Sequence, residues 1–168
     1  MFLATTALDE FWDAKQEKIL LAGEWCRLYG RDYSVEMECL PYLWSNSKNV
    51  YEAQLFCNKV YENVLIWMTK ELNCYLGLNR NTHYYRILLG NWLIHFIHQA
   101  YDKYLIFKSA KEYGATKTWS LDPEQFYYPS DFIDFISRSV DSDLYQLQLF
   151  SQVAKYLDFN TEPKLIQH

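Results

Sequence analysis

The residues best suited to chemistry lie together near the N-terminus. The apolar run Lys18–Ala22 leads directly into Gly23, Glu24, Trp25 and, two positions later, Arg27. A glutamate can act as a general base or accept a hydrogen bond from a sugar hydroxyl, a tryptophan can stack on a sugar ring, and an arginine can pair with an anion. Because ligands of open α/β sheets bind beyond the carboxyl ends of the strands, this pattern predicts a ligand-binding loop.

A purely structural reading of the same loop stays open. In that reading Trp25 belongs to the core, and Glu24 is an ordinary carboxylate at a helix start, where the helix dipole favours negative charge. In the functional reading Glu24 is the candidate catalytic residue, and Gly23, Trp25 and Arg27 bind substrate.

A second candidate group opens a later helix. His83 and Arg86 lie three residues apart, on the first turn of a helix predicted to begin near Thr82. The free backbone N–H groups of that turn, together with the arginine, would bind a phosphate or a carboxylate. The alternative is a surface arginine on a helix that Thr82 caps.

Metal, redox and cofactor motifs are not predicted. His95, His98 and Asp102 share a helix face, but a bundle-type metal site needs matching carboxylates from neighbouring helices, and no ExxH partner occurs. We therefore expect hydrogen-bonded histidines and no metal. The four cysteines form no CxxC pair, which indicates reduced thiols. Phosphate-loop, GxGxxG, GxSxG and HExxH patterns do not occur, so no cofactor is expected within this chain.

The elements that must position these residues indicate an α/β fold. Three strand-length apolar runs at Phe2–Thr6, Lys18–Gly23 and Val35–Pro41 each lead into polar residues, and Thr116–Asp122 is a candidate further strand. Asp9 is a candidate cap of a short helix. We predict a small parallel, Rossmann-like sheet with long packed helices and a helical C-terminal section.

Two long helices follow the first three strands. Helical spacing from Asn49 to Leu76 ends at Gly77, and a second helix runs from Thr82 to about Tyr113, with Gly114 as its stop. Apolar side chains cover nearly every face between Tyr84 and Ile97. We expect this half to be buried on all sides, with Gly90 permitting close packing or a kink, and the part beyond Gln99 to emerge into solvent.

The C-terminal section contains two shorter predicted helices. The first has Ser130 as its cap, and the second opens at Asp141 or Ser142. The segment after residue 159 has no periodicity. We therefore predict one α/β domain over residues 1–159 and a loose tail over residues 160–168.

Composition limits the class of protein. The chain has 168 residues, of which 50% are hydrophobic and 18% aromatic, as expected for one packed domain. A net charge of -5 without a basic stripe argues against nucleic-acid binding. The most apolar run, Ile87–Ile97, is about half the roughly 20 residues that a membrane span needs. With no basic leader at the N-terminus, we expect a cytoplasmic protein without a membrane span.

Five segments, taken in order, resemble the N-terminal part of the transferases encoded in bacterial O-antigen and other surface-polysaccharide clusters. The similarity covers nearly the whole chain, and it is specific only in combination. The segments are MFLATTALDEFWD, KILLAGEWCRLYG, CLPYLWSN, HYYRILLGNWLIHFIHQAYDKY and DLYQLQLFSQVAKYL.

The resemblance implies a sugar transferase of two facing Rossmann-like domains, which uses a nucleotide sugar as donor and a glycan or lipid-linked glycan as acceptor. The N-terminal domain would hold the acceptor, and a C-terminal transferase domain would bind the donor. That second domain is expected to be missing here, through a truncated gene, an excised domain or a short paralogue. Catalysis by this chain alone would then be incomplete, at a cytoplasmic location or at the periphery of the inner membrane.

The resemblance also carries residues over to this chain. The matching positions are Gly23, Glu24, Trp25, Cys26, Trp44, Arg86, Gly90 and Trp92. Where the family tends to have a histidine before the tryptophan and acidic residues after it, this chain has Leu43, Ser45 and Asn46. If those family residues are catalytic, binding without turnover is the expectation.

Glu24, Arg27, His83 and Arg86 are predicted to meet near one cleft, and Trp44 is a further substrate-binding candidate. Two alternatives remain. One is a non-catalytic interaction module that binds a partner through aromatic-rich helices, which a large exposed apolar patch would favour. The other is an independent small enzyme with a closed pocket of its own.

Overall fold

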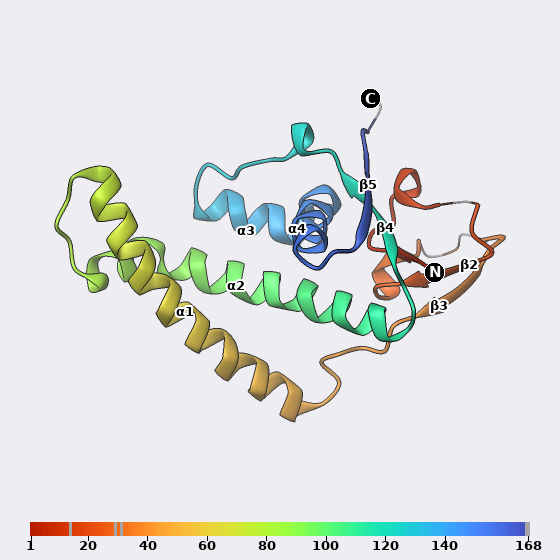
Figure 1. Ribbon diagram of the computed structural model, residues 1–168, viewed down its shortest axis with the longest axis horizontal. Coiled ribbons are helices and arrows are strands. Elements are labelled where there is room, and N and C mark those ends of the chain that lie inside the picture. Colours follow the sequence, from red (N-terminus) through yellow and green to blue (C-terminus); the bar gives the residue numbers. More distant parts are fainter. Residues whose placement is uncertain (14, 29, 31, 167–168) are drawn as a thin grey trace. The chain divides into compact units, whose positions relative to one another are not determined.

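Five strands form one all-parallel sheet in a computed structural model that describes residues 1–13, 15–28, 30 and 32–166 (Figure 1). The strand order is β3-β2-β1-β4-β5, as in the first five strands of doubly wound nucleotide-binding sheets. The predicted α/β class and the predicted parallel sheet are therefore confirmed. The strands are β1 (Phe2–Ala4), β2 (Lys18–Leu21), β3 (Glu36–Cys39), β4 (Lys117–Leu121) and β5 (Asn160–Lys164).

Four α-helices and three short 3-10 helices complete the described elements. The α-helices are α1 (Ser47–Leu76), α2 (Thr82–Glu112), α3 (Phe132–Asp141) and α4 (Asp143–Tyr156). The 3-10 helices are η1 (Asp9–Phe11), η2 (Glu24–Cys26) and η3 (Pro123–Gln125). The short helix expected after Asp9 is η1, but the Asp9 side chain lies outside the described part. None of the described helices is both long and apolar enough to cross a membrane.

The centre of the sheet is buried on both faces. All three residues of β1 are fully buried. The last three residues of β2 are buried as well, with only 1% of the Ile19 surface exposed. Continuous apolar runs are typical of parallel strands that are covered on both sides. Phe107 of α2 and Phe150 of α4 belong to the same hydrophobic cluster as these strands, with their ring centroids 5.9 Å apart.

The chain divides into two compact units. The first consists of residues 1–43 and 102–168 and contains the whole sheet, and the second consists of residues 44–101. Helix α2 contributes its first part to the second unit and its remainder to the first. The boundaries of a single domain over residues 1–159 stay a prediction.

The second unit is a hairpin of α1 and the first part of α2. Gly77 ends α1 with φ 63°, a left-handed conformation that glycine adopts without steric cost, as predicted. The Asn73 side chain ties the turn together by bonding both backbone groups of Arg80 and accepting the Tyr85 hydroxyl at 2.9 Å. Asn81, rather than Thr82, caps α2, because its Oδ1 accepts from the Tyr84 N–H at 2.9 Å.

The predicted burial of α2 is wrong in both halves. Ile87 is 71% exposed, whereas Tyr85, Leu93 and Ile97 are buried, so only one stripe of the first half packs on α1. Beyond Gln99 the helix does not emerge into solvent, because Phe107 and its neighbours pack on the sheet. A run of apolar residues on all faces therefore did not mean burial on all faces. Periodicity reports which residues are apolar and not which neighbours are available.

The caps of the two C-terminal helices differ from the prediction in one case and agree with it in the other. Asp131 caps α3 in place of Ser130, with its side chain accepting from the Asp134 N–H at 2.8 Å. Ser142 caps α4, as predicted.

The loose tail predicted from residue 160 is wrong over Asn160–Lys164, which form β5 and pair with β4 along its full length. In that register Thr118 lies beside Thr161, and Ser120 beside Pro163. An edge strand needs backbone pairing on one side only, so its sequence can lack an apolar pattern. Residues 167 and 168 lie outside the described residues.

Candidate functional site

The η2 loop is held firmly at the carboxyl ends of β1 and β2. The Ala22 N–H donates to the Ala4 carbonyl at 2.9 Å, and the Cys26 thiol donates to the same carbonyl oxygen at 3.3 Å. Cys26 is fully buried, and this burial raises the pKa of its thiol to about 12. Cys26 is therefore a neutral anchor, and the loop follows the strand as the sequence predicted.

Trp25 projects from this loop with 51% of its surface exposed. The alternative that Trp25 belongs to the core is therefore wrong. Its ring lies directly against the backbone of Gly23, where a Cβ atom would be 1.9 Å from Cζ3 of the indole. Because no other residue type leaves room for the ring in this position, Gly23 and Trp25 act as one unit that presents an aromatic surface to solvent.

Glu24 and Arg27 form an exposed ion pair beside Trp25. The Arg27 Nε donates to Glu24 Oε2 at 3.1 Å, and the Arg27 Nη2 bonds the same oxygen. This bond to Arg27, with a smaller contribution from the Cys39 thiol, holds the pKa of Glu24 below its ordinary 4.5. Burial, with the nearby charge of Glu24, raises the pKa of Cys39 to about 11.

The ion pair defines what Glu24 can do chemically. A carboxylate with a lowered pKa is a weaker proton acceptor near neutral pH, so general-base catalysis is disfavoured. Its oxygens still accept hydrogen bonds, and hydroxyl groups are suitable donors. Glu24 is also the first residue of η2, so its position agrees with the helix-start alternative as well.

Arg86 is already engaged by a carboxylate. Its two terminal nitrogens donate to the two oxygens of Glu62 at 2.6 Å each, and its guanidinium carbon lies 5.4 Å from the centroid of the Tyr61 ring. Arg86 holds the pKa of Glu62 below its ordinary value. An anion at the start of α2 would therefore have to displace Glu62, while His83 is exposed on the same turn.

The predicted site residues fall into two groups. Gly23, Glu24, Trp25 and Arg27 lie together in the first unit, whereas Trp44, His83 and Arg86 belong to the second. Trp44 is half-buried just before α1. The shared cleft of the two groups stays a prediction.

No metal site emerges from the residues that the structure describes. Within them, no group of three or more histidine, cysteine, aspartate or glutamate side chains is suitably arranged. His95 and His98 are exposed on α2. The four cysteines are free thiols.

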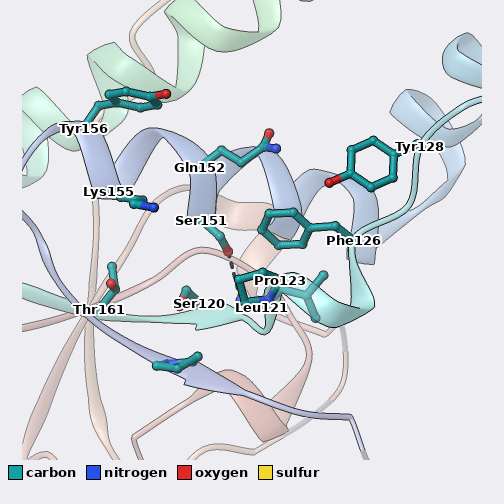
Figure 2. Close-up of a pocket in the computed structure, with 11 residues that line it drawn as sticks. Ser120, Leu121, Pro123, Phe126, Tyr128, Ser151, Gln152, Lys155, Tyr156 and Thr161 are labelled. Atoms are coloured by element: carbon teal, nitrogen blue, oxygen red, sulfur yellow. Dashed lines mark hydrogen bonds between the residues drawn. The ribbon is translucent and has the colours of Figure 1, made fainter.

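A cleft of about 500 Å³ in the first unit was missed by the sequence predictions (Figure 2). It lies between α4, the adjacent faces of β4 and β5, and the segment that follows β4. The sequence analysis did not predict this cleft because it predicted a loose tail in place of β5, and β5 forms part of the cleft. The cleft is lined by Ser120, Leu121, Pro123, Phe126, Tyr128, Ser151, Gln152, Lys155, Tyr156, Thr161 and Pro163.

Comparison with known proteins identifies a family. The model of the LIC12162 family transferase matches residues 1–167, which is nearly the whole chain. No curated protein and no solved structure matches the chain.

Proposed function

The chain belongs to the LIC12162 transferase family, and from this premise we propose that it serves sugar transfer in bacterial surface-polysaccharide (O-antigen) biosynthesis by holding the glycan acceptor on the η2 loop. The observation that carries this proposal is the exposed Trp25 ring, laid against Gly23 at the carboxyl end of β2. An aromatic face flanked by a carboxylate and a guanidinium offers stacking and hydrogen bonds to a sugar ring.

The proposed reaction transfers a glycosyl group from a nucleotide sugar. An acceptor hydroxyl oxygen attacks the anomeric carbon of the donor and forms the new C–O bond. The bond from that carbon to the phosphate oxygen breaks, its electron pair leaves with the nucleoside diphosphate, and the hydroxyl proton passes to solvent.

In this scheme Glu24 orients the acceptor hydroxyl by accepting its hydrogen bond. The lowered pKa of Glu24 supports this role over proton abstraction. Following the resemblance, we assign the donor to a C-terminal transferase domain, so this chain alone is expected to bind acceptor without turnover.

A titration with two ligand classes tests the proposal. Purified protein is titrated with oligosaccharides of bacterial surface polysaccharides and, separately, with nucleotide sugars, and binding is followed by calorimetry. We expect the oligosaccharides to bind and Trp25→Ala to weaken their binding about tenfold, which corresponds to about 1.4 kcal/mol. Trp67→Ala is the matched control, because Trp67 is a 60% exposed tryptophan on α1. Nucleotide-sugar binding that depends on Trp25 would contradict the acceptor assignment.

A second candidate function is favoured by exposed apolar side chains of the second unit. They recur along α1 and in the first turns of α2, and an apolar surface of this kind suits a partner chain. Sedimentation over a range of concentrations tests for self-association through them, and a single monomeric species would argue against it. The side chains are Tyr51, Leu55, Phe56, Ile66, Trp67, Ile87 and Leu88.

A further inference from the structure

We propose that the cleft between α4 and the β4–β5 part of the sheet, called here the α4 cleft, is a second saccharide site that binds a neutral part of the glycan. Figure 2 shows its floor and walls. The identity of the ligand as the acceptor glycan rests on the proposed function, whereas the preference for a neutral saccharide rests on the cleft itself.

The floor of the α4 cleft is built from small and mostly polar side chains. The register of β4 and β5 places Ser120 beside Pro163, and Thr161 lies two residues away on the same face of the sheet. Ser151 of α4 covers them. Where a helix covers a sheet, large apolar side chains normally fill the space to a high density. Small side chains here leave about 500 Å³ open, within the about 300–1,000 Å³ typical of small-molecule sites.

Several polar groups of the α4 cleft have no partner within the described part of the protein. Ser120 is 8% exposed, Gln152 and Thr161 are half-buried, and Lys155 is exposed. None of these four side chains makes a hydrogen bond to another described residue. Ser151, in contrast, accepts from the Leu121 N–H at 2.9 Å and donates to a backbone carbonyl. Among the described residues only Gln99 Oε1 is a buried side-chain atom without a partner, so the polar atoms of the cleft are open to water. A ligand with hydroxyl groups can replace that water and bond the same atoms.

The chemistry of these groups matches sugar hydroxyls. The hydroxyls of Ser120 and Thr161 and the amide of Gln152 can each donate and accept hydrogen bonds, as sugar hydroxyls do. The ammonium of Lys155 adds a further donor. Lys155 is the only cation that lines the described cleft. A nucleotide or sugar phosphate typically requires arginine forks or several converging donors, so the balance favours a neutral saccharide.

Aromatic rings bound the α4 cleft at both ends. Phe126 and Tyr128 lie at one end, and Tyr156 lies at the other (Figure 2). Tyr128 and Tyr156 are largely exposed, so the faces of their rings are available to stack on a ligand.

The α4 cleft and the η2 loop belong to the same sheet. The strands are parallel, so the carboxyl ends of β2 and β4 lie on the same side of the sheet. The η2 loop follows β2 there, and the Phe126–Tyr128 segment follows β4. β2 and β4 are two strand spacings apart, about 10 Å. One oligosaccharide that contacts both places gains affinity from the second contact, since its local concentration is high.

The test uses neutral oligosaccharides of increasing length and amide chemical shifts of the full chain. Tyr156→Ala and Gln152→Ala remove two side chains that α4 contributes to the cleft. Tyr75→Ala is the control, because Tyr75 and Tyr156 are both 86% exposed. We expect shift changes around Ser120 and Thr161, and an affinity for the longer oligosaccharides at least fivefold lower in the two cleft variants and unchanged in the control.

The outcomes separate the two proposals. If Trp25→Ala abolishes shifts at η2 while shifts around Ser120 persist, both sites bind saccharide independently and the inference holds. If the cleft variants bind like the unaltered protein, the inference fails while the η2 proposal stands. If a nucleotide binds in the cleft and Lys155→Gln abolishes that binding, the saccharide assignment is wrong. If no oligosaccharide binds to the protein at all, both the cleft proposal and the η2 proposal are wrong.

Discussion

Lys117 and Asp13 are 104 residues apart in the sequence and are joined by a hydrogen bond of 2.9 Å. Asp13 also accepts from the Gln16 side chain at 2.8 Å and from the Lys15 N–H at 3.2 Å. The bond from Lys117 is the largest cause that holds the pKa of Asp13 below its ordinary 3.8. Since Lys117 begins β4 and Asp13 follows η1, this pair links the first crossover of the sheet to its fourth strand.

Asp13→Asn should therefore destabilise the protein in a pH-dependent way. The depressed carboxyl pKa means that the stabilisation is fully present above about pH 4 and is lost as pH falls through the folded-state pKa. We expect urea unfolding at pH 7 to show a loss of about 1–3 kcal/mol, as for other partly buried charged hydrogen bonds. The difference between variant and unaltered protein should shrink near pH 3. An equal loss at both pH values would show that Asp13 acts through packing alone.

Gly23→Ala should remove the function of Trp25 without unfolding the protein. The new Cβ needs the space that the indole occupies, so the ring must move. We expect a changed tryptophan emission spectrum and a loss of oligosaccharide affinity close to that of Trp25→Ala. In a double-mutant cycle, Gly23→Ala should have no further effect once Trp25 is alanine. Additive losses would mean that the two residues act separately.

Glycan binding should depend on the charge of Glu24. The pKa of Glu24 is below 4.5 because Arg27 bonds its carboxylate, so affinity should be flat above about pH 5 and fall at lower pH. Arg27→Gln should shift this fall to higher pH, since the carboxyl group then titrates nearer its ordinary value. Calorimetric titrations at pH 4, 5 and 7 measure the shift. Identical pH profiles in the two proteins would exclude Glu24 as the titrating group.

Gly90→Ala tests the packing of α2 on α1. A Cβ on Gly90 would lie 2.7 Å from the Tyr61 hydroxyl oxygen, while replacing a helical glycine with alanine favours the helix by up to about 1 kcal/mol. We expect Gly90→Ala to gain less stability in the unaltered protein than in a Tyr61→Phe background, where that oxygen is absent. The gains are compared by urea unfolding. Equal gains would show that Tyr61 moves aside without cost.

The cysteines should differ in reactivity. Cys26 is fully buried with a thiol pKa of about 12, whereas Cys74 is exposed on α1. Because only the thiolate reacts, an alkylating reagent at pH 8 should modify Cys74 rapidly and Cys26 only after unfolding. Mass spectrometry of the labelled peptides gives both rates. Equal rates in the folded protein would contradict the anchoring of η2 by Cys26.

Much of the fold could be predicted because local and tertiary preferences agree in its centre. The runs of β1 and β2 are apolar on both faces, which is what a covered parallel sheet requires. The end of α1 needs a positive φ, and Gly77 supplies it. Predictions failed where tertiary contacts determine the structure. The first half of α2 has apolar residues on more faces than its neighbours cover, so some of them are exposed. The strand conformation of β5 depends on its pairing with β4.

The candidate site was predictable only in part for the same reason. Gly23, Glu24, Trp25 and Arg27 are close in sequence, so their grouping follows from the strand before them. The bond between Arg86 and Glu62 joins two helices and could not be inferred from spacing within one. The α4 cleft joins residues from β4, α4 and β5, and it exists only once the last strand is in place.

Pro163 disfavours the pairing of a further strand alongside β5, the edge strand of the described sheet. The Asn160 N–H and the Lys164 carbonyl face β4, and directions alternate along a parallel strand, so position 163 faces away from β4. Proline has no N–H group to offer there. A strand from a second molecule that added itself alongside β5 would find no N–H donor at position 163, so this edge of the described sheet is poorly suited to nucleate aggregation.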